Sequence, residues 1–196
     1  MNDVEPRLRL ATPADASAIE ALMKRSAAAI FPRYYDERQC MSAVRHVAEV
    51  DPMLLADGTY FVLESDGEIV ACGGWSRRDR LYTGSGTAEA DDRLLDPATE
   101  PARVRAMFVR DDWTRRGLGR RILEECEAAA HHEGFRELEL GATLPGVPLY
   151  RAYGFEPVSE FDATLSDGVK LACVGMKKAI PDQSADRTAR PHATRA

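Results

Sequence analysis

The sequence predicts an α+β domain in which one strand–helix–strand unit is built into a mostly antiparallel sheet. Residues 104–109, 117–132 and 138–141 have the patterns of a strand, a helix and a strand in turn. The segments on either side are short strands, and tight-turn residues favour antiparallel pairing there. The chain has 196 residues, of which 44% are hydrophobic and 30% charged. This composition is typical of one soluble globular domain.

The first third of the chain predicts one short strand and two helices. Residues 8–10 form the strand, and Thr12, Pro13 and Asp15 then supply a cap, a first helical residue and a capping box. Apolar residues follow at helical spacing: Ile19, Leu22, Met23 and Ile30. A weaker helix is predicted over residues 37–50, ending before the Asp51–Pro52 pair.

The next segment predicts a β-hairpin and then a long loop. Strands over residues 60–64 and 68–72 are joined by Ser65, Asp66 and Gly67, and the second strand extends toward Trp75. Residues 76–101 are polar and show no regular period. Loops of this length in compact domains usually bind a ligand or are mobile.

The strand over residues 104–109 is predicted to place Val104, Ala106 and Phe108 on one face. The other face takes the alternate residues: Arg103, Arg105, Met107 and Val109. The helix over residues 117–132 has an apolar stripe and ends at Gly134. Beyond the 138–141 strand we expect a helix over 148–153, a strand from Phe155 and a last strand over 169–176. We expect residues 1–180 to form the domain and the polar residues 181–196 to be a disordered tail.

Composition also excludes several classes of function. No apolar run is long enough for a membrane span, and the charged N-terminus does not resemble a secretory signal. The widely spaced cysteines and the adjacent His131 and His132 predict no metal site, and the thiols are expected to be reduced in a cytoplasmic protein. The net charge of −6 disfavours broad nucleic-acid binding.

One short stretch, WTRRGLGRR at residues 113–121, predicts an anion site. Gly117 and Gly119 stand where a helix begins, and the first N–H groups of a helix have no partner within it. Four arginines add local positive charge, and missing β-carbons let a phosphate approach the backbone. The stretch lacks the third glycine of a dinucleotide fingerprint and the Gly-Lys-Ser/Thr ending of a P-loop. Alone, it is equally compatible with a basic helix start whose glycines serve packing.

The surroundings of this stretch resemble those of the GCN5-related N-acetyltransferase superfamily. The strand RAMFV, the following TRRGLGRRILEECE and the later PLYRAYGFEP match the two signatures of that family in order and spacing. Thr114 stands where glutamine or arginine is usual, and Thr143 where asparagine is frequent. The resemblance implies a mixed, mostly antiparallel sheet of six to seven strands flanked by about four helices. It also implies that the 104–109 strand separates from the strand near residues 140–143.

The resemblance further implies acetyl-CoA as the cofactor, lying in the gap between these two strands. The thioester would face a backbone N–H near Phe108 or Val109 that stabilises the developing oxyanion. Tyr150 matches the acid that protonates the leaving thiolate, although it is also compatible with an aromatic packed under the cofactor. Glu64, Glu100 and His46 remain alternative candidates for the general base. The residues implied to bind the cofactor are Met107, Phe108, Val109, Thr114, Arg115, Arg116, Gly117, Leu118, Gly119, Arg120, Thr143 and Tyr150.

The acceptor pocket is expected from the variable segments, with four aromatic residues as candidate walls: Tyr34, Tyr35, Trp75 and Tyr82. Arg77, Arg78 and Arg80 are either a solvated loop face or a site for an acidic acceptor. The favoured function is acetyl transfer to a primary amine of a small molecule. A protein lysine or N-terminal acetyltransferase and a non-catalytic acyl-CoA-binding regulatory domain are the alternatives. A homodimer is left open.

Overall fold

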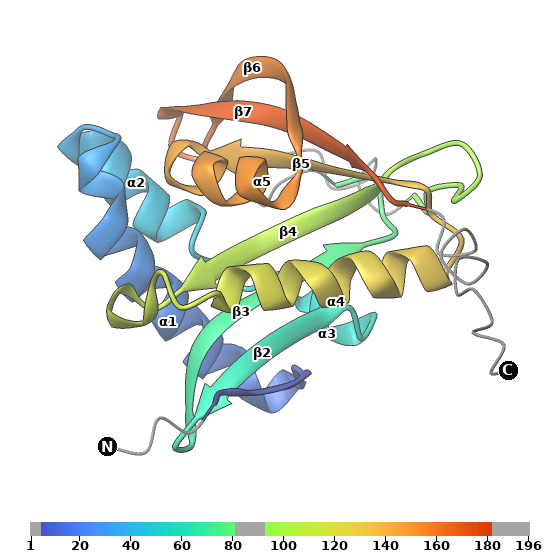
Figure 1. The fold of residues 1–196 in the computed structure, drawn as a ribbon. Helices are drawn as coiled ribbons and strands as arrows, with labels where there is room; N and C mark the ends of the chain where they lie inside the picture. The colour runs from blue at the N-terminus through green and yellow to red at the C-terminus, as the bar shows by residue number, and fades with distance from the viewer. Residues whose placement is uncertain (1–4, 81–92, 182–196) are drawn as a thin grey trace, which may run out of the picture.

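The computed structural model describes residues 5–80 and 93–181, which form one seven-stranded sheet flanked by helices on both faces (Figure 1). The strand order is β1-β2-β3-β4-β5-β7-β6, and every neighbouring pair is antiparallel except β4 and β5. This confirms the predicted mixed sheet. The strands are β1 (Arg7–Leu10), β2 (Tyr60–Ser65), β3 (Glu68–Ser76), β4 (Ala102–Val109), β5 (Glu137–Thr143), β6 (Glu156–Thr164) and β7 (Lys170–Ala179).

Two hydrophobic cores fill the space between the sheet and its helices. On one face α4 crosses β2, β3 and β4, and its buried residues pack with Trp75 and Phe135 (Figure 1). On the other face α1 packs its apolar stripe, including Ile19 and Met23, against Val62. The helices are α1 (Ala16–Ile30), α2 (Glu37–His46), α3 (Pro52–Ala56), α4 (Leu118–His132) and α5 (Val147–Tyr153). No helix in the described part of the chain is both long and apolar enough to cross a bilayer.

The helix predicted over residues 37–50 is wrong at its C-terminal end. The helix α2 ends at His46, and a separate short helix, α3, begins at Pro52. Asp51 caps α3, because its carboxylate accepts a hydrogen bond of 2.9 Å from the Met53 N–H. The Asp–Pro pair was therefore a helix start, and reading it only as a helix stop missed α3.

The predicted alternation along β4 is also wrong, because the strand contains a bulge. Ala106 has a φ of +52°, and the register between β3 and β4 shifts between Cys72 and Gly74. A bulge adds one residue and so reverses the face on which later side chains lie. Val104 therefore packs in the core under α4, whereas Phe108 packs in the core under α1.

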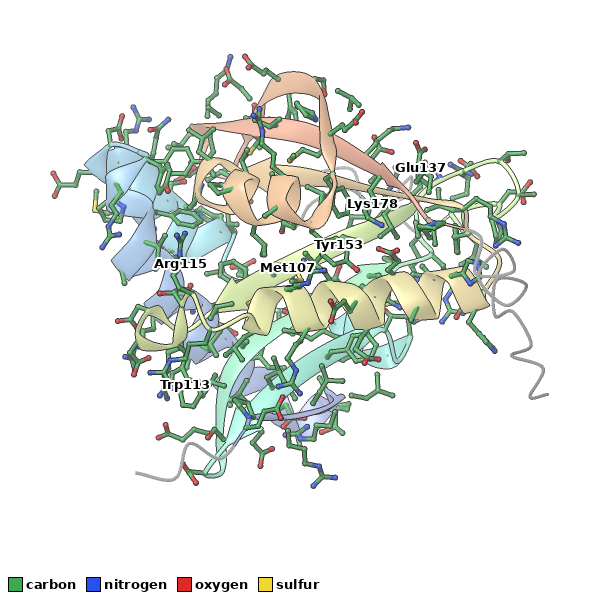
Figure 2. The ribbon with its side chains drawn as sticks, viewed as in Figure 1. Met107, Trp113, Arg115, Glu137, Tyr153 and Lys178 are labelled. Atoms are coloured by element: carbon green, nitrogen blue, oxygen red, sulfur yellow. The ribbon has the colours of Figure 1, made fainter. Side chains whose placement is uncertain are left out.

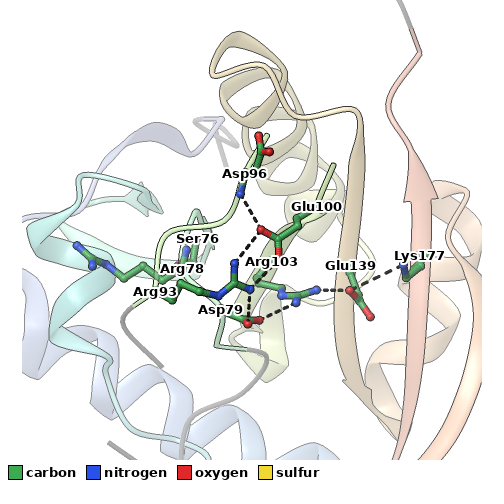
Figure 3. A network of polar contacts seen from close by, with 9 residues as sticks. All are labelled: Ser76, Arg78, Asp79, Arg93, Asp96, Glu100, Arg103, Glu139 and Lys177. Carbon is green, nitrogen blue, oxygen red and sulfur yellow. Dashed lines mark hydrogen bonds and ion pairs between the residues drawn. The ribbon is translucent and has the colours of Figure 1, made fainter. Parts of the chain in front are cut away.

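The strands β4 and β5 form a fork. Their ladder has two pairs, Ala102 with Leu138 and Arg103 with Glu139; beyond them β4 stays with β3 and β5 with β7. An ion network lies at the closed end (Figure 3). There Arg103 contacts Glu139 and, at 2.9 Å, Asp79. Arg93 pairs with Asp79 and with Glu100. The predicted separation of the two strands is thus present.

Candidate active site

A long groove of about 830 Å³ runs along the open end of the fork. Its walls are the C-terminal part of α1, the end of β4 with the loop after it, and the start of α5. We call this space the long groove. It brings together most of the residues predicted to bind the cofactor: Met107, Phe108, Val109, Thr114, Arg115, Gly117, Leu118, Gly119 and Arg120.

The turn before α4 has the geometry of an anion cradle. Arg115 and Gly117 have φ angles of +64° and +80°, so two residues in three are left-handed, an arrangement that turns backbone N–H groups toward one point. The first N–H groups of α4 add donors and the positive end of the helix dipole. A β-carbon built on Gly117 meets no atom within 4 Å, so a side chain there would fill the open space over the turn. The turn therefore offers backbone donors and open space of the kind that an anion needs.

Position 119 requires glycine because of packing between helices. A β-carbon there would lie 2.8 Å from Cδ2 of Leu149, so Gly119 lets α5 approach α4 closely. The packing interpretation is thus confirmed at Gly119, whereas the anion site at Gly117 stays a prediction.

The arginines of the stretch are not equivalent. The Arg116 guanidinium lies over the Trp113 ring, 4.6 Å from its centroid, and Arg116 does not line the long groove. Arg120 pairs with Glu124 at 2.9 Å and also lies over Tyr153. Figure 2 shows Trp113 and Arg115 in the loop before α4, with Met107 on β4 beyond it. Arg115 and Arg120 are the arginines of this stretch that line the groove, and Arg33 lines it from the segment after α1.

A second, smaller space of about 90 Å³ lies deeper in the fork, and we call it the small cavity. It is lined by residues 104–108 of β4, by Gly141 and Thr143 of β5, by Tyr150 and by side chains of β6 and β7. Met107 and Phe108 line both the long groove and the small cavity. The two spaces therefore meet at the point where β4 has left β5.

Tyr150 belongs to the wall of the small cavity. Its residue is 9% exposed, and its ring packs edge-on against Phe155 with centroids 5.7 Å apart. Burial raises the pKa of the phenol above its usual value of about 10, because desolvation disfavours the phenolate. Tyr150 therefore keeps its proton at neutral pH. With Thr143, it lines the small cavity and not the long groove.

The three candidates for the general base lie in different places. Glu64 pairs with Arg9 on β1, and Glu100 pairs with Arg93 in the network at the closed end. Neither lines the groove or the cavity. His46 ends α2 with Nε2 3.6 Å from the Asp167 carboxylate, and the following residue, Val47, lines the small cavity. Of the three candidates, only His46 is next in sequence to a residue that lines the cavity.

The expected acceptor residues are dispersed. Tyr34 is 44% exposed and lines the long groove. Tyr35 is buried, and its hydroxyl donates to the Ala172 carbonyl and accepts from the Leu144 N–H, both at 2.8 Å. The expectation for Trp75 is wrong, because this side chain is 1% exposed and packs on Phe135 in the core. Tyr82 lies outside the described residues.

Sequence reasoning missed the far wall of the small cavity. That wall comes from β6 and β7, through Phe161, Ala163, Leu165, Leu171 and Cys173. These residues are apolar and alternate with exposed ones, a pattern that core strands also show. Only the curvature of the sheet turns them toward β4, and no sequence signal gives that curvature.

A sequence profile described as an acetyltransferase (GNAT) domain matches residues 56–157, which is just over half of the chain. The chain belongs to the GNAT family of acetyltransferases. As a member of this family it is an N-acetyltransferase with acetyl-CoA as its cofactor, and the matched segment contains β2 to β5, the cradle and Tyr150. No curated protein matches the sequence significantly.

Solved structures share the fold of this GNAT protein at low sequence identity. A GCN5-related N-acetyltransferase from Rhodopseudomonas palustris superposes with a TM-score of 0.68 at 19% identity, covering 91% of this chain and 98% of the other. The PaiA N-acetyltransferase of Thermoplasma acidophilum, solved with coenzyme A, gives 0.62 at 13% identity, covering 90% and 99%. A ribosomal-protein-alanine N-acetyltransferase from Brucella melitensis gives 0.57 at 19%, covering 88% and 99%. At these identities the likeness establishes the fold alone.

Proposed function

We propose that this GNAT protein transfers the acetyl group of acetyl-CoA to the primary amine of a small molecule, by direct attack within a ternary complex. The observation that carries the proposal is the meeting of the long groove and the small cavity at Met107 and Phe108. The groove fits a long donor with a diphosphate, and the cavity fits a small acceptor. Holding two reactants side by side in the reacting geometry lowers the barrier to direct attack of the amine on the thioester.

The residues of the fork then have separate tasks. Bound acetyl-CoA supplies an activated acetyl group and a leaving thiolate that needs a proton. The main-chain N–H of Val109, on the edge of β4 that has left β5, stabilises the charge that develops on the carbonyl oxygen, an effect worth about 3–4 kcal/mol in other enzymes. Tyr150 holds a proton on its phenol oxygen beside the cavity and donates it to the thiolate.

A small acceptor is favoured over a polypeptide because the far side of the small cavity is tied shut. The α2 segment and the β6–β7 hairpin are joined by hydrogen bonds of 2.8 Å between Ser42 Oγ and the Asp167 carboxylate. A further bond of 2.9 Å joins Gln39 Nε2 to the Lys170 carbonyl. Val47 and Leu165, next to these contacts, line the cavity. An acceptor that reaches the cavity past these contacts must be small.

The test is thiol release from acetyl-CoA over a panel of small amines and lysine-containing peptides, with calorimetry of coenzyme A binding in parallel. We expect saturable binding, turnover with one or more small amines, and intersecting lines in two-substrate kinetics. Turnover with peptides and not with small amines would instead support a protein lysine or N-terminal acetyltransferase. Saturable binding without turnover on any acceptor would support the regulatory alternative, and no binding at all would remove the groove as the donor site.

A further inference from the structure

Arg105 lies in the wall of the small cavity, three residues before Phe108 on β4. Its side chain is 2% exposed, and Nη1 lies 3.1 Å from the carboxylate of Asp51. The other arginines that the sequence offered for an acidic acceptor do not line the cavity. Arg77 pairs with Glu133, Arg78 pairs with Asp57, and Arg80 lies 3.5 Å from the Asp51 carboxylate that Arg105 also contacts.

The two members of this buried ion pair differ in their relation to the cavity. Asp51 does not line the cavity and caps α3 instead, whereas Arg105 forms part of the cavity wall. Most of the remaining wall is apolar, with Val47, Val104 and Leu171 among its members. In such surroundings charges are weakly screened, so the wall attracts an anion and repels a second cation.

Arg103 shows that burial and pairing on β4 do not by themselves place an arginine at the site. It lies two residues earlier on the same strand, is 12% exposed and pairs with Asp79 and Glu139 (Figure 3). It lines neither the long groove nor the small cavity. The bulge at Ala106 follows directly after Arg105, at the point where the strand edge becomes free of β5.

We propose that Arg105 is a specificity-determining residue that binds a carboxylate of the acceptor, so that the acceptor is a small amino acid or a similar amino-carboxylate. The inference rests on the proposed function and names its substrate class. A guanidinium has five N–H donors in a planar fork, so it can engage the acceptor carboxylate as well as Asp51. With the carboxylate at Arg105, the amine of the acceptor lies toward Met107 and Phe108, where the groove and cavity meet. A cavity of about 90 Å³ corresponds to roughly three waters at their liquid volume of about 30 Å³ each, so it suits only a small acceptor.

The experiment compares each amino acid with its own methyl ester as acceptor, using thiol release with saturating acetyl-CoA. Rates are compared per free-base amine over several pH values, because esterification lowers the pKa of the amine. We expect kcat/KM of the wild-type protein to favour the free acid by about 10- to 100-fold, as for a charge-assisted contact. We expect Arg105→Gln to bring the ratio close to one and Arg105→Lys to retain part of it.

Arg103→Gln is the matched control, since it removes a buried, paired arginine from the same strand away from both spaces. We expect it to lower the melting temperature and to leave the acid-to-ester ratio unchanged. A purely structural role of Arg105 would lower stability in the same way without changing the ratio. Coenzyme A affinity, measured by calorimetry, shows that each variant retains the donor groove.

A binding measurement keeps the inference testable even if Arg105→Gln does not fold. The wild-type protein loaded with coenzyme A is titrated with an N-acetylated amino acid and with the methyl ester of that compound. Tighter binding of the acid, by about tenfold or more, supports the assignment. Equal binding together with equal turnover of acids and esters overturns it while leaving the proposed function intact. Coenzyme A binding without turnover of any amine contradicts the proposed function itself.

Discussion

The two ends of the β4–β5 fork are built from opposite kinds of contact. At the closed end the strands pair, and the charged side chains there are satisfied within the protein: Asp79, Arg93, Glu100, Arg103 and Glu139. At the open end the strands share no pair. The long groove and the small cavity lie there. They are bordered by β4, by the first turn of α4 and by Tyr150. The closed end fixes the register, and the open end leaves polar groups for ligands.

This difference explains why one strand carries both tasks. The ladder and the ion pairs join β4 to β5 at the closed end, and the bulge at Ala106 then turns Met107 toward the core under α4 and Phe108 toward the core under α1. Changes at the open end should therefore affect turnover and binding, whereas changes at the closed end should affect stability.

The largest expected effect on turnover is at Tyr150. We expect Tyr150→Phe to reduce kcat by roughly 10- to 1,000-fold and not to abolish it, since a phenol is a helpful but weak acid for a thiolate. The phenylalanine ring preserves the packing on Phe155, so the melting temperature should change little. The measurement is steady-state thiol release with an acceptor that the wild-type protein uses. A variant with the full wild-type rate would show that Tyr150 only packs.

The next effect is on donor affinity, at the cradle. Gly117 has a φ of +80° and an open β-carbon position, so Gly117→Val both strains the turn and fills the space over it. We expect the dissociation constant of coenzyme A to rise by about 30-fold or more. Gly67, in the β2–β3 turn, is a matched control, with a φ of +78° and an equally open β-carbon position. Gly67→Val should lose similar stability and keep wild-type affinity in calorimetry; equal losses of affinity would contradict the cradle.

Local signals in the sequence predicted most of the elements in their order and the turn before α4, but not α3. The strand, turn and helix pattern around Gly117 is short-range, and so is the hairpin at Gly67, because turn residues act on their immediate neighbours. Asp51 and Pro52 carry the same kind of local signal. The sequence analysis predicts the end of a helix there, whereas the structure has the start of α3.

Long-range geometry was not available from the sequence. The bulge at Ala106 depends on how β3 and β4 pair, and alanine has no preference for a left-handed φ. The burial of Trp75 under α4 and the exposure of Tyr34 in the groove follow from how helices lie on the sheet. The cationic wall at Arg105 likewise becomes visible only once α3 places Asp51 beside it.

At the closed end the expected effect is on stability. Arg103→Gln leaves the carboxylates of Asp79 and Glu139 without their shared guanidinium, and these groups are partly exposed. We expect a loss of about 2 kcal/mol in the free energy of unfolding, between the values typical of surface and buried pairs. This corresponds to about 4–8 °C in melting temperature for a chain of this size. Coenzyme A affinity should stay within about threefold, as measured by calorimetry; a much larger loss would mean that the closed end also shapes the groove.

The smallest expected effect is the pH dependence of the stability that Arg103→Gln loses. Hydrogen bonds from Arg103 and then Arg93 hold the pKa of Asp79 below its usual value near 3.8. A carboxyl group whose pKa is lowered by folding stabilises the protein above its unfolded-state pKa, and this contribution disappears as pH falls through the folded-state pKa. Urea unfolding from pH 7 down to about pH 3 should therefore show the gap between wild type and Arg103→Gln narrowing below about pH 4, by roughly a few tenths of a kcal/mol. Acidic groups remote from Arg103 titrate in both proteins and cancel in the difference, so a gap that stays constant with pH would remove Asp79 as the partner through which Arg103 stabilises the fork.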